Sequence, residues 1–194
     1  ELRSKHMILD IHNKDDKFSY SYINNQAVSM VNSEYVLFLN NDTEVIDGNW
    51  LSAMVGYAQI DNVGIVGARL LFPDNRVQHA GVVLGLYNGM VAPAFKLLPD
   101  YDLGYFNFAK VTRNYSCVTA ACMIIRKSLF NELNGFDEEN FAVAYNDVDL
   151  CVRCLKQGKR IVYAAQAELY HYEGATRGFV DNIDEVLNLS LIHI

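Results

Sequence analysis

Long apolar runs in this chain mark the segments that we expect to form strands. Runs without a polar residue at every second position are typical of strands that are covered on both faces of a sheet. Turn residues, such as those of the FPDNR segment at 72–76, separate the runs. The expected strands are 7–11, 35–40, 63–72, 117–126, 159–165 and 167–172.

Apolar residues at helical spacing predict helices between these strands. The second helix has Asp47 or Asn49 as its cap, and the last has Asn146 as its cap and Gly158 after its end. The region 85–115 is rich in glycine, asparagine and aromatic residues without a clear period, and we expect it to be irregular. The expected helices are 19–31, 49–59, 127–133 and 146–158.

Strands that alternate with helices predict an α/β domain with a mostly parallel sheet. The chain has 194 residues, of which 51% are hydrophobic and 20% are charged, so it can bury the core of a single domain. In sheets of this kind ligands bind beyond the carboxyl ends of the strands. Polar residues that directly follow a strand are therefore the first candidates for a functional site.

The charge of the chain argues against general nucleic-acid binding. The formal net charge is −7, and no basic run is present that could neutralise a phosphate backbone. A small phosphorylated ligand is still compatible with this charge, because one metal ion would offset it locally. We therefore expect no nucleic-acid partner.

One uncharged stretch, 77–95, is long enough to raise the question of a membrane span. It contains Gln78, His79, Asn88 and Pro93, which a helix in contact with lipid tolerates poorly. We expect no transmembrane segment. The expected location is cytoplasmic, with attachment to the inner face of the membrane as a further option.

Four cysteines raise the question of a zinc site or disulfide bonds. Cys117 and Cys122 lie an odd number of residues apart in an expected strand, so their side chains should point to opposite faces. This arrangement disfavours a metal cage that uses all four cysteines. We expect reduced cysteines in a cytosolic core.

The first candidate site is the polar segment at the end of strand 35–40. Asp42 follows Asn40 and Asn41, and a carboxylate among short oxygen-bearing side chains suits a hard divalent cation that also binds a diphosphate. An ordinary Asx turn explains the same residues, and the local sequence leaves both interpretations open. An EF-hand loop with Gly48 at its sixth position is excluded, because its twelfth residue would be Met54.

Two further candidates are Asp147 and His171. Asp149 can pair with Arg153 one helical turn later, which gives it a structural role and leaves Asp147 free to accept a proton from a substrate hydroxyl. His171 lies at the end of the expected strand 167–172. A lone histidine there is more often a structural residue than a metal ligand, so only its combination with the other candidates makes it of interest.

These motifs, taken in their order along the chain, resemble the later portion of a family 2 glycosyltransferase with the GT-A fold. The resemblance covers about residues 8–178 and depends on the order and spacing of several motifs. It implies a GT-A-like mixed, mostly parallel sheet that is flanked by helices. The motifs are 35–45 (YVLFLNNDTEV), 63–85, 118–130, 135–163 and 167–178 (AELYHYEGATRG).

The resemblance implies metal-dependent transfer of a sugar from a nucleotide-sugar donor to an acceptor hydroxyl, with inversion at the anomeric carbon. Asn40, Asn41 and Asp42 are similar to the DxD motif, in which Asp42 would bind Mg²⁺ or Mn²⁺. Asp147 matches the general base of the family's ED motif, and His171 matches a histidine that helps to hold the metal or the diphosphate. A glycan or a lipid-linked molecule would be the acceptor.

The chain departs from the family pattern in three ways. Asn40 replaces an acid, which weakens the negative charge at the metal. Asn146 replaces the Glu of the ED motif and so removes a like charge beside Asp147, which we expect to lower the pKa of Asp147. The first two strands of the family, with their nucleoside-binding motifs, have no counterpart.

We expect three parts in the chain: a leader at 1–7 that looks like a cloning junction, a truncated GT-A domain at 8–180 and a tail at 181–194. The truncation leaves open whether the domain is active. The loss of strands would expose a sheet edge, through which the protein could form a homo-oligomer. The tail is apolar and could cover such an edge.

Two other functions compete with this interpretation. A non-catalytic module of the same fold could bind a glycan or a protein through Tyr87, Tyr101, Tyr105 and Phe106, although packing within a loop is the simpler explanation for these residues. A nucleotidyltransferase would need a glycine-rich phosphate loop, which the sequence lacks. The motif at 78–81 recurs in relatives without an evident role, and the donor sugar, the acceptor and the pathway are not encoded in a readable way.

Overall fold

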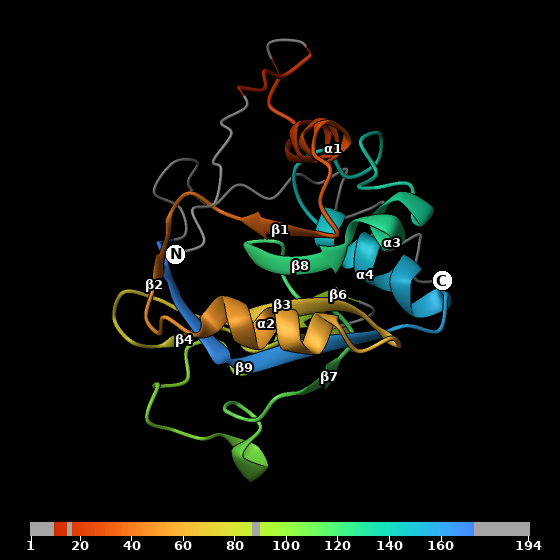
Figure 1. Ribbon diagram of the computed structural model, residues 1–194. Coiled ribbons are helices and arrows are strands. Elements are labelled where there is room, and N and C mark those ends of the chain that lie inside the picture. The colour runs from red at the N-terminus through yellow and green to blue at the C-terminus, as the bar shows by residue number, and fades with distance from the viewer. Residues whose placement is uncertain (1–9, 15–16, 87–89, 173–194) are drawn as a thin grey trace, which may run out of the picture.

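A seven-stranded mixed sheet forms the centre of the protein (Figure 1). The computed structural model describes residues 10–14, 17–86 and 90–172. The strand order is β1-β8-β3-β9-β2, while β4 pairs with β3 and β7 pairs with β9. The strands are β1 (Tyr35–Leu39), β2 (Thr43–Val45), β3 (Val63–Leu71), β4 (Val77–His79), β7 (Arg113–Tyr115), β8 (Cys122–Arg126) and β9 (Arg160–His171).

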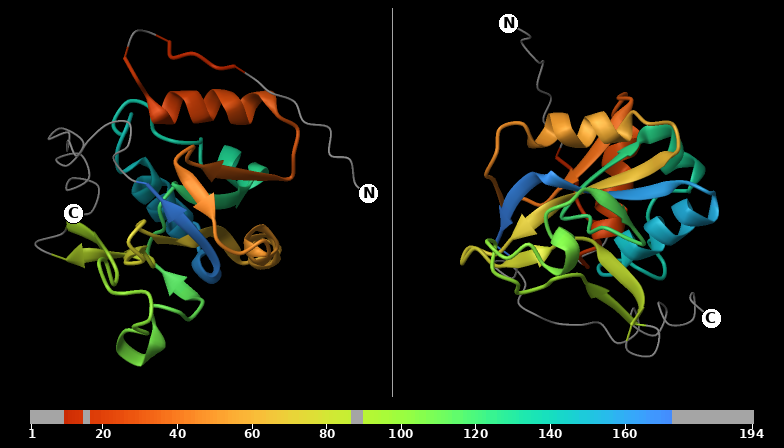
Figure 2. Two further views of the ribbon diagram at one scale, coloured as in Figure 1. Left: turned by 90° about the vertical axis from the view of Figure 1, so that its left-hand side faces the viewer. Right: turned by 90° about the horizontal axis from the view of Figure 1, so that it is seen from below.

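Helices cover both faces of this sheet, with α2 on one side and α4 on the other (Figure 2). Alternate residues of the strands point into two apolar layers, as the strand pleat requires. Ile65 and Ile125 belong to the layer that includes residues of α1, α3 and α4, whereas Val66 and Ile124 belong to the layer under α2. The helices are α1 (Tyr20–Met30), α2 (Trp50–Ala58), α3 (Lys127–Glu132) and α4 (Asn146–Lys156).

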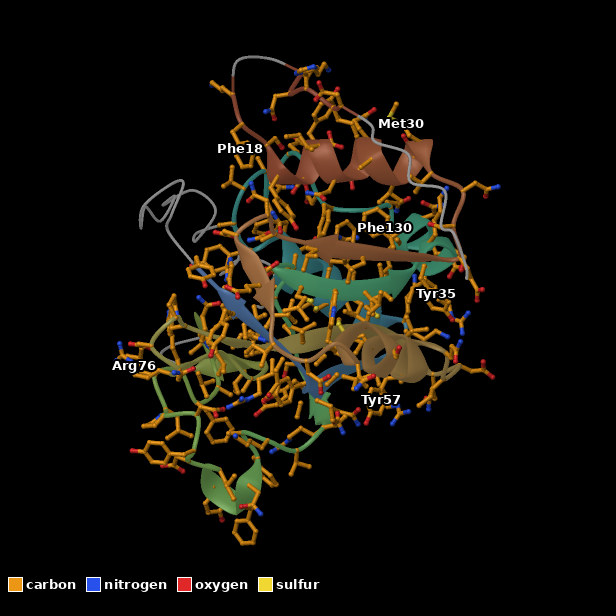
Figure 3. All side chains as sticks on the ribbon, turned by 60° about the vertical axis from the view of Figure 1, so that its left-hand side comes forward. Phe18, Met30, Tyr35, Tyr57, Arg76 and Phe130 are labelled. Atoms are coloured by element: carbon orange, nitrogen blue, oxygen red, sulfur yellow. The ribbon has the colours of Figure 1, made fainter. Side chains whose placement is uncertain are left out.

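An aromatic cluster attaches α1 to the sheet, and its member Phe130 lies below α1 in Figure 3. The rings of Phe38, Phe130 and Phe136 lie 4.8 to 5.4 Å apart between centroids, and Tyr20 of α1 meets Phe136 at 5.8 Å. The Tyr20 hydroxyl also donates to the Ala120 carbonyl at 3.2 Å. Such edge-to-face contacts add about 0.5–1.5 kcal/mol per pair to the burial of the rings.

Burial on both faces, which we expected for strand 35–40, is wrong for β1 and is found instead in β3. All nine residues of β3 are buried, because this strand has neighbours on both sides and helices on both faces. In β1 only Phe38 is buried, and Leu39 is 43% exposed. β1 stands at the end of the described sheet, so its outer edge and part of its face are uncovered.

The expectation of a mixed sheet flanked by helices is confirmed, but the expectation that the sheet is mostly parallel is wrong. Among the described strands only β3 and β9 pair in parallel. β8 inserts antiparallel between β1 and β3. Consequently β1, β3 and β9 still run in one direction, and their carboxyl ends meet at one edge of the sheet.

Several boundaries differ from those expected. β8 begins at Cys122, because the chain at 117–121 turns away and Cys117 forms a bridge with Val82. The strands expected at 159–165 and 167–172 form a single strand, β9, whose pairing register with β3 shifts at the point where we placed the break.

The region 85–115 is more regular than expected. A two-stranded sheet of β5 (Val82–Leu86) and β6 (Met90–Pro93) opens it, the 3₁₀ helix η1 (Tyr105–Asn107) follows, and β7 closes it.

The helix caps also differ from those expected. Asn146 is not the cap of α4: it is the first helical residue, and Tyr145 precedes it with a left-handed φ of 58°. Asn49 stands at the cap position of α2 as expected, but its side chain makes no capping hydrogen bond. The Asp47 carboxylate instead accepts the Asn49 N–H at 2.8 Å.

The four cysteines are buried and free, as expected. Cys122 lies in the apolar layer under α2, and Cys117 lies in the opposite layer. Within residues 10–14, 17–86 and 90–172, no helix is long and apolar enough to cross a membrane. The proposed leader and tail, and most of the strand expected at 7–11, lie outside the described residues; Asp10 and Ile11 are not in a strand.

Candidate functional site

The polar turn after β1 lies against the end of β9, although the two are far apart in the sequence. The Asn40 N–H donates to the Ala121 carbonyl at 2.9 Å at the point where β1 ends. The chain then turns into β2, where Thr43 pairs with His171 of β9. The Tyr172 N–H donates to the Asp42 carbonyl at 2.9 Å. Backbone pairing therefore brings Asp42 beside His171.

The ring of His171 is held in one orientation by Gln78. The Gln78 amide nitrogen donates to the His171 carbonyl at 3.2 Å, which turns the amide oxygen toward the ring, 2.6 Å from Nδ1. Because an amide oxygen only accepts, Nδ1 carries the proton, and in the neutral ring Nε2 presents a lone pair. Nε2 lies 3.2 Å from Asn40 Nδ2, which can donate to it.

The Asp42 carboxylate completes this cluster. Its Oδ1 atom lies 3.1 Å from His171 Nε2, and the two side chains are only 20% and 10% exposed. This pair is an ion pair if the ring is protonated, but Oδ1 is buried and receives no hydrogen bond. With a neutral ring the two atoms face each other as acceptors, and a cation bound to both would give the buried Asp42 Oδ1 atom a partner.

The cluster fits a divalent cation with few protein ligands. In an octahedral site, two neighbouring ligand atoms that each lie about 2.1 Å from the ion are about 3 Å from each other. Asp42 Oδ1 and His171 Nε2 are separated by a similar distance, 3.1 Å. The described residues contain no group of three or more His, Cys, Asp or Glu side chains that could hold a metal. Mg²⁺ and Mn²⁺ sites that are completed by substrate phosphates need only one or two protein ligands.

Asp147 lies in the first turn of α4 and is held by the segment before β8. Its Oδ2 atom accepts the Ala120 N–H at 3.0 Å, and its Oδ1 atom accepts the Val148 N–H at 2.8 Å. The Thr119 hydroxyl interacts with the same carboxylate. These contacts fix the position of both carboxylate oxygens.

Burial raises the pKa of Asp147 above its ordinary value, and the hydrogen bonds from Ala120, Val148 and Thr119 offset this effect only in part. Asn146 is not among the causes of this shift, and the lowering that we expected relative to a Glu at position 146 stays a prediction. Protein atoms surround the carboxylate group of Asp147, but the residue as a whole is only half-buried and keeps some contact with solvent. A raised pKa makes a carboxylate a better proton acceptor as long as it remains ionised.

Asp147 and His171 line the same cavity, which has a volume of about 480 Å³. Asp42 stands beside it through its contact with His171. The structure thus brings together three of the residues selected from the sequence. The cavity is also lined by Gln78, His79, Val82, Val91, Pro93, Lys96, Thr119, Val143, Ala144, Tyr145, Asn146 and Val148.

Two residues of β4 support the site, and sequence reasoning had assigned them no role. Gln78 orients His171, as described above. His79 accepts the Thr119 N–H at Nε2, 3.2 Å away, and so supports the segment that holds Asp147. The recurring motif at 78–81 was the only signal in the sequence that pointed to them.

Other residues selected from the sequence lie apart from this cluster. Asn41 is exposed in the turn, and no contact described in residues 10–14, 17–86 and 90–172 ties its side chain to Asp42 or His171. Asp149 is buried and accepts from Arg153 at 2.5 Å and 2.9 Å, as expected of a structural acid. Arg153 also donates to the Leu133 and Gly135 carbonyls.

Comparison with protein families gives a match to the family described as Glycosyltransferase like family 2 over residues 6–183. Two curated relatives are each 46% identical over 164 residues, which is 84% of this chain. One is an O-antigen biosynthesis protein of Myxococcus xanthus and the other an uncharacterised protein of Sinorhizobium fredii. The chain spans only 13% and 18% of their lengths.

A solved structure of GalNAc-T7 with UDP, GalNAc and Mn²⁺ has a similar fold, with a TM-score of 0.59 at 12% identity. The match covers 80% of this chain and 31% of that chain. At this level of identity the similarity concerns the fold alone. It supports the GT-A architecture that the motifs predicted.

Proposed function

Because this chain belongs to the glycosyltransferase-like family 2, we propose that it forms the site for transfer of a sugar from a nucleotide-sugar donor to an acceptor hydroxyl. The observation that carries the proposal is the shared cavity of Asp147 and His171, with Asp42 Oδ1 only 3.1 Å from His171 Nε2. A proton acceptor and a pair of metal ligands are the groups that such a transfer requires.

Asp42 and His171 would hold Mg²⁺ or Mn²⁺ together with the donor diphosphate. When bound, the ion supplies positive charge against the negative charge that develops on the departing diphosphate. Asn40 is neutral, so the site has one carboxylate, and its affinity for the free ion should be low until a diphosphate adds its own negative oxygens. Asn41 is less well supported as a ligand, since its side chain is exposed.

Asp147 would act as the general base. It would accept the proton of the acceptor hydroxyl while that oxygen attacks the anomeric carbon from the face opposite the diphosphate. One displacement inverts the configuration and needs no protein nucleophile, whereas a retaining glycosidase uses a pair of carboxylates. Hydrogen bonds to both oxygens of Asp147 hold the carboxylate in place for this transfer.

The relatives suggest the class of acceptor. One relative is named for O-antigen biosynthesis, so we propose a glycan or a lipid-linked acceptor and a role in polysaccharide biosynthesis. Four buried free thiols support a reducing, cytoplasmic environment. The uncovered edge of β1 supports self-association through strand pairing, or pairing with another part of a longer chain.

The test is Asp147→Asn, which removes the proton acceptor and keeps the shape. Release of nucleoside diphosphate from a panel of UDP-, GDP- and dTDP-sugars with Mn²⁺ should fall by roughly 10²- to 10⁴-fold. Asp61→Asn is the matched control, since Asp61 is an exposed carboxylate in a turn outside the cavity lining. Turnover of Asp147→Asn at the parental rate would remove Asp147 from the role of base.

A second candidate function is a glycan-binding module without catalysis. It is favoured by three exposed aromatic side chains, Tyr101, Tyr105 and Phe106, which are 84%, 72% and 74% exposed. Packing within a loop does not account for this exposure, while Tyr87 lies outside the described residues. Calorimetry separates the two functions: UDP with Mn²⁺ should bind if the donor site is present, whereas a module would bind glycan alone.

A further inference from the structure

A tight turn at 94–98 is attached at one end to β4 and at the other to Gly81, two residues after that strand. The Ala94 N–H donates to the Gly81 carbonyl at 2.8 Å, and the Leu97 N–H donates to the Val77 carbonyl at 2.7 Å. The Val77 N–H in turn donates to the Leu98 carbonyl at 2.7 Å. The turn therefore has a fixed position relative to the strand that carries Gln78 and His79.

The backbone of this turn is strained on both sides of Lys96. Phe95 has a φ of 58° and Leu97 a φ of 69°, left-handed values that bulky residues with a side chain rarely adopt. Conformations of this kind persist only where the surrounding contacts enforce them, and they concentrate at functional sites. Here they display Lys96, an exposed side chain that lines the cavity together with His171 and Asp147.

A bound diphosphate would leave the cavity with more negative charge than one divalent ion balances. Asp147 and the adjacent Asp42 already contribute two carboxylates, which one divalent ion would only balance. A diphosphate adds at least two further negative charges. Among the described residues that line the cavity, Lys96 is the only lysine or arginine.

We propose that Lys96 binds a phosphate group of a diphosphate in this cavity, an inference that rests on the proposed sugar transfer. As the acceptor oxygen bonds to the anomeric carbon, its proton passes to Asp147. The bond from that carbon to the diphosphate oxygen breaks, and its electron pair stays on the diphosphate. Lys96 keeps its own protons and stabilises the charge that builds up there.

Inorganic pyrophosphate with Mn²⁺ is the probe, because it contains the diphosphate group that Lys96 would bind and needs no nucleoside pocket. In calorimetry, Lys96→Met should bind pyrophosphate with about tenfold lower affinity than the parent, which is the loss expected for one charge-assisted contact. Lys96→Arg should retain most of the affinity, because it keeps the charge. Lys156→Met is the matched control: it changes the net charge equally, but Lys156 lies at the far end of α4.

The outcomes separate this inference from the proposed function. If Lys96→Met binds pyrophosphate as tightly as the parent while Asp42→Asn loses it, the role of Lys96 is refuted and the metal-diphosphate site stands. If Lys96→Arg is as weak as Lys96→Met, charge is not the reason and the inference also fails. If the parent does not bind pyrophosphate with Mn²⁺ at all, both proposals fall.

The diphosphate could come from the nucleotide-sugar donor or from a lipid-linked acceptor. Competition against pyrophosphate distinguishes them, with UDP, GDP and dTDP in one arm and geranyl diphosphate in the other. Displacement by a nucleoside diphosphate assigns Lys96 to the donor, and displacement by geranyl diphosphate alone assigns it to the acceptor. Displacement by neither would refute a diphosphate site.

Discussion

Acidification should destabilise this protein through His79, whose ring the fold keeps neutral. Nδ1 lies 3.0 Å from the Ala68 carbonyl, which can only accept, so Nδ1 carries a proton. Nε2 accepts the Thr119 N–H at 3.2 Å, and a proton on Nε2 would face that donor. Both contacts are satisfied together only in one neutral tautomer. Burial lowers the pKa of His79 from 6.5 to about 4.

The size and the sign of the effect follow from this shift. Between pH 6.5 and pH 4 the unfolded chain binds a proton that the folded protein does not, so stability is complete above pH 6.5 and is lost as the pH falls. At pH 5 the loss is about 2 kcal/mol, and well below pH 4 it approaches about 3 kcal/mol. Either loss is a large share of the stability of a typical domain.

Urea unfolding at pH 7 and pH 5 would measure this loss, with the fluorescence of Trp50, the single tryptophan, as the signal. His79→Gln is the control, because it keeps a polar side chain that does not titrate. Asp147, whose pKa is raised, contributes in the opposite direction, but it does so in both proteins and cancels in the comparison. The parent should lose about 2 kcal/mol more than the variant. Equal losses would refute the assignment of a neutral, buried His79.

Two further changes test the support of the site. Gln78→Leu removes the group that orients His171 and should weaken Mn²⁺-dependent pyrophosphate binding roughly 10- to 100-fold, as measured by calorimetry; an unchanged affinity would show that Gln78 does not set the ring. Gly67→Ala would place a Cβ atom 2.4 Å from Val118 Cβ, so the urea midpoint should fall by the equivalent of about 1–3 kcal/mol. Gly56→Ala, in α2 with open space around it, should instead be neutral or stabilising, and equal effects of the two changes would contradict the packing argument.

Local pattern alone was sufficient for the elements with the strongest signals. The apolar run of β3, interrupted only by Arg69, predicted a strand, and the structure adds that the whole strand is buried, Arg69 included. The amphipathic spacing of α4 and its terminating Gly158 predicted that helix, although its first residue was misassigned. The position of Asp42 directly after a strand made it a candidate, whereas His171 became one only in combination with the other motifs and through the family resemblance.

Features that depend on partners distant in the sequence escaped this reasoning. The pattern of a strand specifies which faces are apolar, but backbone hydrogen bonds join strands without regard to side-chain identity. The sequence pattern therefore did not predict that β8 inserts antiparallel between β1 and β3. The same holds for Gln78 and His79, whose importance arises from contacts with His171 and Thr119 that only the fold creates.

The amino-acid sequence thus determined the family and the type of most elements, and it predicted three residues that the fold brings together in the candidate site, because each of these is written in short motifs and local periodicity. The tertiary structure decided which strands are neighbours, which way the ring of His171 faces and which charges share a cavity with Asp147. These are properties of distances between segments far apart in the chain, and burial and hydrogen bonding at those distances set the chemistry of the site.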